Sequence, residues 1–408
     1  MSANGQGSLF AGRRLQMNQS IQLTIDSLMV YGPTHDHWAI AWSGGKDSTT
    51  LVTLVCWMID TGRVPAPKTL TVMYADTRLE LLPLWLAAES IRYELGERGV
   101  EVRVVMAPLD KRFLVYVLGR GVPPPNNNTL RWCTRQIKID PMTAELRRLH
   151  GDRGGKILML TGVRQGESAI RDGRIQMSCS RDGAECGQGW YQETLPDQLC
   201  DTLAPLLHWR VCHVWEWLRH WAPKPEFGDW STEIIADAYG GDEAEEINAR
   251  TGCTGCPLTE KDTALDAVIA RPAWSYLAPL KLLRPLWREL RKPAVRLRKR
   301  GRELRKDGTP AANPQRMGPI LLDTRLAALD RVLAVQAEVN AGAHAAGRPL
   351  IDLLNAEEEA RIRELIGLNT WPDGWDGDEA IGDELLEKVY ADGSVQPLLP
   401  MFIKVGRE

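Results

Sequence analysis

The sequence predicts an α/β fold with a parallel, twisted sheet that carries helices on both faces, followed by a mainly helical C-terminal region. Three observations support this prediction. Between residues 37 and 163, apolar runs of strand length alternate with longer stretches of helical spacing. The strand-like runs are apolar almost throughout, which is typical of parallel strands buried on both faces. Beyond about residue 260 the sequence looks helical, with basic and acidic blocks.

The expected elements follow one another in a regular order. The first 36 residues are polar and mixed, so we expect an arm with one short helix. Pro83 lies in the first turn of the helix predicted at residues 79–96, where its missing N–H costs no hydrogen bond. The segment 123–129, PPPNNNT, is expected to be irregular. Strands are predicted at 37–43, 68–76, 100–108 and 156–163, and helices at 46–60, 79–96, 111–119 and 140–151. Residues 166–200 predict a polar active-site loop, and residues 205–221 an aromatic helical segment.

Length, charge and hydropathy limit the class of protein. The 408 residues exceed a typical domain of about 100 to 200 residues, so we expect one domain plus an appended region. The net charge of −3 means that any surface for nucleic acid must be local. The first residues contain no apolar signal core, and no run of about 18 apolar residues occurs. A soluble, cytoplasmic protein without a membrane partner is expected.

The segment SGGKDS, residues 43–48, joins the first predicted strand to the first long helix. Its glycines let backbone N–H groups approach an anion, and the helix adds its positive N-terminal end. Lys46 adds a point charge, and the serines add hydroxyl donors. An ordinary glycine turn would explain the glycines but not the other side chains. The spacing also differs from a Walker A loop, whose two glycines are separated by four residues. The segment therefore predicts a phosphate-binding loop.

Several motifs resemble known families. SGGKDS resembles the pyrophosphate loop (PP loop) of the adenine nucleotide α-hydrolase-like enzymes, which split ATP into AMP and pyrophosphate. YADTRLELLP (74–83) resembles the Asp-Thr-Gly-x-x-x-Pro-Glu-Thr segment of the phosphoadenosine phosphosulfate (PAPS) reductase family, with Arg78 in place of the glycine and the final Glu-Thr absent. TGVRQGESAIR (161–171) resembles that family's Gly-x-Arg-x-x-Glu-Ser-x-x-Arg element, with Ser168 among its matches. The resemblance covers about residues 37 to 260.

The resemblance implies a set of site residues and roles. Lys46 and the loop amides would stabilise the departing pyrophosphate, and Asp47 would help to hold Mg²⁺. Arg164 and Arg171 would clamp phosphate through their planar forks, and Asp76 would contact the nucleotide or a metal. The catalytic candidates are Lys46, Asp47 and Ser48. The nucleotide-binding candidates are Ser43, Gly44, Gly45, Lys46, Asp47, Ser48, Asp76, Thr77, Gly162, Arg164, Glu167 and Arg171.

The chain has eight cysteines, and in a cytosolic protein metal or catalytic use is favoured over disulfides. RWCTRQIKIDP (131–141) and RTGCTGCPLTEKD (250–262) resemble the segments with which adenylyl-sulfate reductases hold a [4Fe–4S] cluster, although Trp132 replaces one of two adjacent cysteines. The resemblance implies Cys133, Cys253 and Cys256 as ligands. The fourth ligand is left open between Cys179, Cys186, Cys200, Cys212 and a sulfide, as in certain tRNA-thiolating PP-loop enzymes. A zinc site is the alternative. Cys56 is expected to be a buried apolar residue.

The cysteines also bear on the reaction. Sulfonucleotide reductases use a cysteine near the C-terminus, and no cysteine follows Cys256 here. The combined pattern looks most like the DNA phosphorothioation proteins of the DndC and SspD type, which act with a cysteine desulfurase in a modification and defence system. That resemblance implies adenylation of a DNA backbone phosphate by ATP, followed by sulfur insertion, with other modification-complex subunits as partners. The alternatives are a PAPS or adenylyl-sulfate reductase-like or sulfurylase-like enzyme, a tRNA-thiolating enzyme, and a nucleotide sensor without turnover.

A DNA partner requires a basic surface. RPLWRELRKPAVRLRKRGRELRKDG, residues 284–308, is the densest basic segment, and we call it the basic strip. The alternative is a solvated helix paired with acidic segments such as 373–388. We therefore expect an N-terminal arm (1–36), a PP-loop α/β domain (37–225), a cysteine-pair segment (226–270) and a helical C-terminal region with the basic strip (271–408).

Overall fold

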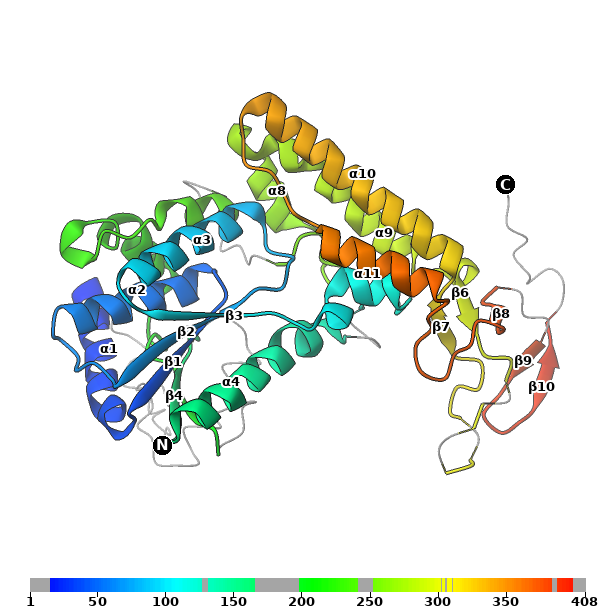
Figure 1. The fold of residues 1–408 in the computed structure, drawn as a ribbon, viewed down its shortest axis with the longest axis horizontal. Coiled ribbons are helices and arrows are strands. Elements are labelled where there is room, and N and C mark those ends of the chain that lie inside the picture. The colour runs from blue at the N-terminus through cyan, green and yellow to red at the C-terminus, as the bar shows by residue number, and fades with distance from the viewer. Residues whose placement is uncertain are drawn as a thin grey trace, which may run out of the picture.

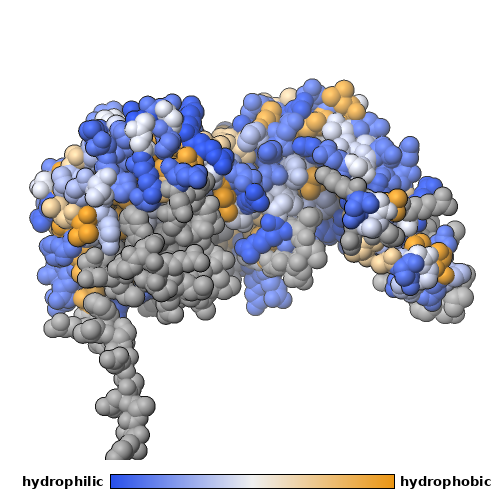
Figure 2. Space-filling model, turned by 90° about the horizontal axis from the view of Figure 1, so that it is seen from below, coloured by the Kyte–Doolittle hydropathy of each residue, from blue (hydrophilic) through white to orange (hydrophobic). Residues whose placement is uncertain are grey.

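The computed structural model describes most of the chain, and Figure 1 shows an α/β domain joined to an elongated C-terminal region. No described helix combines the length and apolar character needed to cross a bilayer. On the face seen in Figure 2, the described surface is mainly hydrophilic, with hydrophobic residues in small groups. The described residues are 15–126, 131–165, 198–240, 252–301, 303–304, 307–309, 311–383 and 387–398.

A five-stranded parallel sheet forms the α/β domain, with the strand order β3-β2-β1-β4-β5. This confirms the predicted fold class. Four of the strands coincide with predicted ones. The fifth strand, β5, was missed, because it has only four residues and Asp201 and Thr202 interrupt its apolar pattern. The strands are β1 His37–Trp42, β2 Thr69–Ala75, β3 Glu101–Val105, β4 Ile157–Leu160 and β5 Cys200–Leu203.

Helices cover both faces of the sheet, as predicted. Side chains of β1 alternate between the faces: Trp38, Ile40 and Trp42 belong to the larger core, and Ala39 belongs to the smaller one. The larger core also contains α1, α2, α3 and α6, whereas the smaller core contains Leu146 and its neighbours from α4. The helices are α1 Met17–Tyr31, α2 Lys46–Asp60, α3 Leu82–Glu97, α4 Asp140–Arg153 and α6 Val211–Glu216.

The N-terminal arm contains more structure than expected. Helix α1 has 15 residues, and Ile21, Ile25 and Leu28 enter the larger core. Two further predictions are adjusted in detail: the helix predicted at 111–119 contains a π-helical turn at Val115–Gly119, and a second π-helical turn, Arg135–Ile139, precedes α4.

The C-terminal region is mainly helical, as predicted, but it also contains short strands. A three-stranded sheet has the order β7-β6-β8, and β9 pairs with β10. The strands have two to four residues each, too few for an alternating pattern to be detected. The elements are α8 Thr263–Ile269, α9 Leu283–Glu289, β6 Arg296–Arg298, β7 Met317–Ile320, α10 Leu322–Ala346, α11 Ala356–Gly367, β8 Ala380–Ile381, β9 Glu387–Val389 and β10 Val395–Pro397.

The two regions share a hydrophobic core. Leu79 and Leu82 follow β2, and Phe113 follows β3; all three pack with residues of α9, α10 and α11. Parallel strands end together at one edge of a sheet. The C-terminal region is therefore packed against the carboxyl edge, where ligands of such folds bind.

Candidate functional site

The loop after β1 is closed by its own serines. The Ser43 N–H donates to Ser48 Oγ at 3.2 Å, and the Ser48 hydroxyl donates to the Gly45 carbonyl at 3.1 Å. Gly45 is the residue before α2, so the loop's amides lie at the positive end of a 15-residue helix. The loop has the form of an anion-binding turn, in agreement with the sequence.

Two glycines are needed for this geometry. Gly44 has a φ of +72°, in the left-handed region that favours glycine. Gly162, just after β4, lies so close to α2 that a Cβ there would be 2.9 Å from the Asp47 carbonyl carbon and 3.0 Å from Ser48 N. The close approach of these two segments explains the glycine in the 161–171 motif.

Asp47 holds two cations. Its carboxylate lies 2.8 Å from Lys46 Nζ and 2.5 Å from Arg164 Nε. Arg164 also donates to the Trp209 carbonyl at 3.3 Å. The three side chains are 18%, 10% and 7% exposed for Asp47, Lys46 and Arg164, so water screens their charges only in part. Two cations converge on one anionic group, and the oxygens of a phosphate would satisfy the same donors.

Tyr239 is a residue of this site that the sequence did not reveal. It ends the 3₁₀ helix Glu233–Tyr239 and is 3% exposed. Its hydroxyl accepts a hydrogen bond from the Lys46 backbone N–H at 3.1 Å, and Lys46 Nζ lies 5.2 Å from its ring centre. A tyrosine 193 positions away carries no local sequence signal that links it to the loop.

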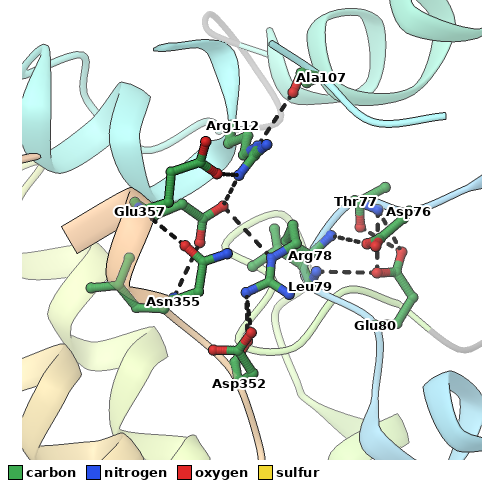
Figure 3. Close-up of polar contacts among 12 residues, drawn as sticks. Asp76, Thr77, Arg78, Leu79, Glu80, Ala107, Arg112, Asp352, Asn355 and Glu357 are labelled. Atoms are coloured by element: carbon green, nitrogen blue, oxygen red, sulfur yellow. Dashed lines mark hydrogen bonds and ion pairs between the residues drawn. The ribbon is translucent and has the colours of Figure 1, made fainter. Parts of the chain in front are cut away.

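Asp76 and Thr77 lie in a tight turn after β2 (Figure 3). Asp76 Oδ1 accepts from the Arg78 N–H at 2.7 Å, and the Thr77 hydroxyl donates to Glu80 Oε1 at 2.5 Å. Burial raises the pKa of Glu80, while the bond from Thr77 opposes that shift. Both Asp76 and Thr77 are buried just after the carboxyl end of β2, and their contact with a nucleotide or metal stays a prediction.

The cysteine-pair segment is tied to this turn. Thr254 donates from its N–H to the Leu79 carbonyl at 2.6 Å and from its hydroxyl to the Glu80 carbonyl at 3.1 Å. Thr254 lies between Cys253 and Cys256 in the chain, so the pair is held beside the edge that carries Asp76.

The three cysteines predicted as ligands influence one another. Burial raises the pKa of Cys253 to about 11, and the thiols of Cys256 and Cys133 raise it further, while Lys138 lowers it. Burial also raises the pKa of Cys133, again with a contribution from Cys256. Trp132, the residue before Cys133, is fixed by stacking on Phe113 with ring centres 5.5 Å apart. Cys133 and Cys253, from two distant segments, both pack against the hydrophobic core that the two regions share.

These thiols are the donor type of an iron–sulfur cluster, in which each cysteine binds a different iron. Within the described residues, no three Cys, His, Asp or Glu side chains are gathered around one point for a single metal ion. Among the described residues, Cys133, Cys253 and Cys256 are therefore not assembled into a metal site, and their binding of a cluster or of zinc stays a prediction.

The other cysteines differ in their positions. Cys200 begins β5, at the amino edge of the sheet and opposite the PP loop, so it cannot be the fourth ligand. Cys212 is exposed on α6. Cys56 is buried, as predicted, and burial raises its pKa to about 12. The remaining candidates Glu167, Ser168, Arg171, Cys179 and Cys186 lie outside the described residues.

The basic strip is divided between several structures rather than forming one helix. Arg284 and Arg288 of α9 donate to the carbonyls of Thr259 and Glu260, next to the cysteine pair. Further along, Arg298 donates to the Gln315 carbonyl, and Lys299 pairs with Glu379 at 2.6 Å. The second half is therefore engaged with the acidic segment 373–388.

Residues 37–223 match the family model "Phosphoadenosine phosphosulfate reductase domain", so this part of the chain is similar to that domain. No curated protein matches the sequence.

Three solved structures with weak similarity illustrate the range of likenesses. A PAPS reductase from Candida auris has 12% identity and a TM-score of 0.31, over 59% of this chain and 97% of that one. The U34-tRNA thiolase NcsA from Methanococcus maripaludis, with its [4Fe–4S] cluster, has 14% identity and a TM-score of 0.32, over 67% and 79%. An FMN adenylyltransferase from Candida glabrata, in complex with FMN and an ATP analogue, has 17% identity and a TM-score of 0.28, over 53% and 60%. Scores this low carry no argument about activity.

Proposed function

We propose that the protein is an ATP pyrophosphatase that activates a DNA backbone phosphate for sulfur insertion, in the manner of the DndC- and SspD-type proteins. One observation carries the proposal: Lys46 and Arg164 converge on a single anionic group at the N-terminus of α2. Pyrophosphate is an anion with several oxygens. It matches this pair of cations and the adjacent loop amides.

The chemistry follows from the poor leaving ability of a phosphate oxygen. A non-bridging oxygen of DNA attacks the α-phosphorus of ATP, a new O–P bond forms, and the bond between the α- and β-phosphates breaks. Lys46, Arg164 and the loop N–H groups stabilise the charge on the departing pyrophosphate. Sulfide then attacks the DNA phosphorus, and AMP leaves with the original oxygen. Asp47 and Asp76 supply the oxygen ligands that Mg²⁺ prefers.

The cysteines provide a place for the sulfur chemistry. Cys133, Cys253 and Cys256 would hold a [4Fe–4S] cluster, which supplies iron that binds and positions a sulfur atom. Thr254 fixes this segment to the Leu79–Glu80 backbone, so the sulfur centre and the ATP edge belong to one site. A cysteine desulfurase, acting with the other subunits of a modification complex, would be the sulfur donor, and a thiol reductant would supply the two electrons that release the sulfur of its persulfide as sulfide.

The charges around Cys133 support a nucleic-acid substrate. Arg131 and Lys138 are exposed and act on the cysteines electrostatically, and the Arg135 side chain is 82% exposed. Arg288 of the basic strip is exposed and donates to the Glu260 carbonyl, in the cysteine-pair segment. We therefore place the DNA backbone over these four cations and assign only the first half of the basic strip to it.

Product analysis tests this proposal. The protein, prepared without oxygen, is incubated with Mg-ATP, cysteine, a cysteine desulfurase, a thiol reductant and either duplex DNA or tRNA. The nucleic acid is then digested and analysed by mass spectrometry. Phosphorothioate-linked dinucleotides from DNA are the expected product. A thiolated base in tRNA, with unmodified DNA, would contradict the proposal and establish tRNA thiolation.

A sulfonucleotide reductase is the second candidate, because the matched family model is that of a PAPS reductase domain. Such an enzyme would release sulfite from PAPS or adenylyl sulfate when a thiol reductant is supplied. Sulfite release without cleavage of ATP would favour this candidate over the first. ATP binding without either reaction would favour the nucleotide sensor.

A further inference from the structure

Arg78 has an unusual backbone conformation at an important position. Its φ is +62°, in the left-handed region that side chains with a Cβ rarely adopt. The motif that this segment resembles has a glycine here. The Arg78 N–H donates to Asp76 Oδ1 at 2.7 Å. The turn is fixed between β2 and α3, so a change of φ at residue 78 has to be taken up by the preceding peptide, which carries this N–H. The carboxylate proposed to meet the nucleotide or Mg²⁺ is therefore oriented by the backbone of a strained residue.

The side chain of Arg78 is held by the C-terminal region (Figure 3). Its Nη2 lies 2.7 Å from Asp352 Oδ2 and 3.0 Å from the Asp352 carbonyl, and its Nε lies 3.7 Å from Glu358 Oε1. The Arg78 side chain is 16% exposed and that of Glu358 is 2% exposed, so their interaction is shielded from water, whereas the Asp352 side chain is 58% exposed.

The C-terminal group is rigid in turn. Glu358 forms a capping box with Asn355 at the start of α11. Arg112, from the segment after β3, adds contacts to Glu358 at 3.4 Å and to Glu357 at 2.9 Å. Asp76, Arg78 and Asp352 also line one pocket between the sheet edge and the segment 350–353. The anchor is thus fixed before any ligand binds.

We propose that Arg78 is a positioning residue, held in its left-handed conformation by Asp352 and Glu358 so that its N–H orients the Asp76 carboxylate. The C-terminal region then helps to position a side chain at the carboxyl edge of the sheet. The contribution of Asp76 to ATP binding rests on the proposed function. The orientation of Asp76 by the anchored arginine does not, and it is tested separately.

The test combines two substitutions. Arg78→Gly removes the side chain, but glycine adopts a φ of +62° at little cost. Asp352→Ala removes part of the anchor while residue 78 keeps its Cβ. The left-handed conformation costs a residue with a Cβ about 1 to 2 kcal/mol. Without the anchor, the population of this conformation at position 78 should therefore fall about five- to thirtyfold. Arg78→Ala loses the anchor and keeps the Cβ.

Hydrogen exchange of the amide at position 78 is the first readout. We expect Arg78→Ala and Asp352→Ala to accelerate exchange about fivefold or more, with Arg78→Gly near the wild type. Asp352→Ala is expected to have no added effect in the Arg78→Gly background. Arg363→Ala, which removes an ion pair with Glu359 on the exposed side of α11, is the matched control. Equal acceleration in Arg78→Gly and Arg78→Ala would overturn the proposal.

The second readout is the Kd for a non-hydrolysable ATP analogue with Mg²⁺. We expect the Kd to rise in Arg78→Ala and Asp352→Ala, the two variants with faster exchange, and to stay near the wild-type value in Arg78→Gly. If the wild type binds no ATP, the proposed function fails, and the exchange pattern still decides whether the anchor orients the turn. If the exchange pattern holds but the Kd is unchanged in all variants, the orientation stands and the role of Asp76 in binding is refuted.

Discussion

Arg164 Nε lies 2.5 Å from Asp47 Oδ1, although 117 positions separate the two residues. This contact joins the segment after β4 to the start of α2, on neighbouring strands of the sheet. It brings two motifs that look independent in the sequence together at the carboxyl edge.

Gly162→Ala should damage the loop without unfolding the domain. The added Cβ would meet backbone atoms of Asp47 and Ser48 at 2.9 to 3.0 Å, and backbone cannot move aside as a flexible side chain can. We expect at least a tenfold loss of ATP binding, measured by calorimetry. Gly151→Ala in α4 is the matched control, since a Cβ there meets nothing within 4 Å, and it should stabilise by about 0.5 to 1 kcal/mol. Unchanged binding in Gly162→Ala would contradict the loop geometry.

Tyr239→Phe should strengthen ATP binding modestly. The hydroxyl occupies the Lys46 N–H, a donor that a phosphate oxygen would otherwise use. Without the hydroxyl, the ligand no longer has to displace a hydrogen bond worth about 1 kcal/mol. The Kd should therefore fall by up to about fivefold. Weaker binding in this variant would instead make the hydroxyl a direct contact of the nucleotide.

Acidification should loosen α1. Burial lowers the pKa values of His208 and His213 below the ordinary value of 6.5, and Arg210 adds to this for His213 while Glu216 opposes it. Folding therefore favours the neutral rings, so the stability they contribute is complete above about pH 6.5 and is lost as the pH falls. His213 lies 3.1 Å from Ser20 Oγ. Hydrogen exchange of α1 should accelerate between pH 7.5 and 5.5, and less so in His213→Gln. Exchange independent of pH would contradict this account.

Arg325→Met should destabilise the C-terminal region. Arg325 is fully buried and donates to the carbonyls of Gly119, Ile320 and Thr370, which join α10 to the segment after β3 and to the end of α11. Leaving these carbonyls unpaired should cost about 3 kcal/mol or more in unfolding free energy. Urea denaturation measures the change. Arg363→Met, on a half-exposed side of the same region, should change stability by less than about 0.5 kcal/mol. Equal effects would refute the role of Arg325.

The part of the fold with strong local signals could be predicted from the sequence. Strand β1 is apolar from Trp38 to Trp42, and Gly44 after it can adopt the left-handed conformation of a tight turn, so the loop and the start of α2 could be predicted. Strand β5 could not be predicted, because its pairing with β4, not its composition, makes it a strand. The same holds for β6, whose arginines read as a charged surface but bond to carbonyls of the fold.

Contacts between distant segments limit the prediction of the site in the same way. The motifs identified Asp76 and Thr77, but the anchor of Arg78 is Asp352, 274 positions away. Tyr239 likewise reaches the loop only through tertiary packing. Side chains that reach a site only through tertiary packing are not part of a local motif, so the sequence shows no characteristic residue spacing by which to identify them.

The most direct measurement is the product ratio from Mg-ATP, determined by phosphorus NMR with and without duplex DNA. The account predicts AMP and pyrophosphate in equal amounts, stimulation by DNA, and no cleavage by Lys46→Ala. That variant should keep its fold, because Lys46 Nζ contacts only Asp47 and the face of Tyr239 among the described residues. Formation of ADP and phosphate, or full activity in Lys46→Ala, would contradict the assignment of residues 43–48 as a pyrophosphate loop.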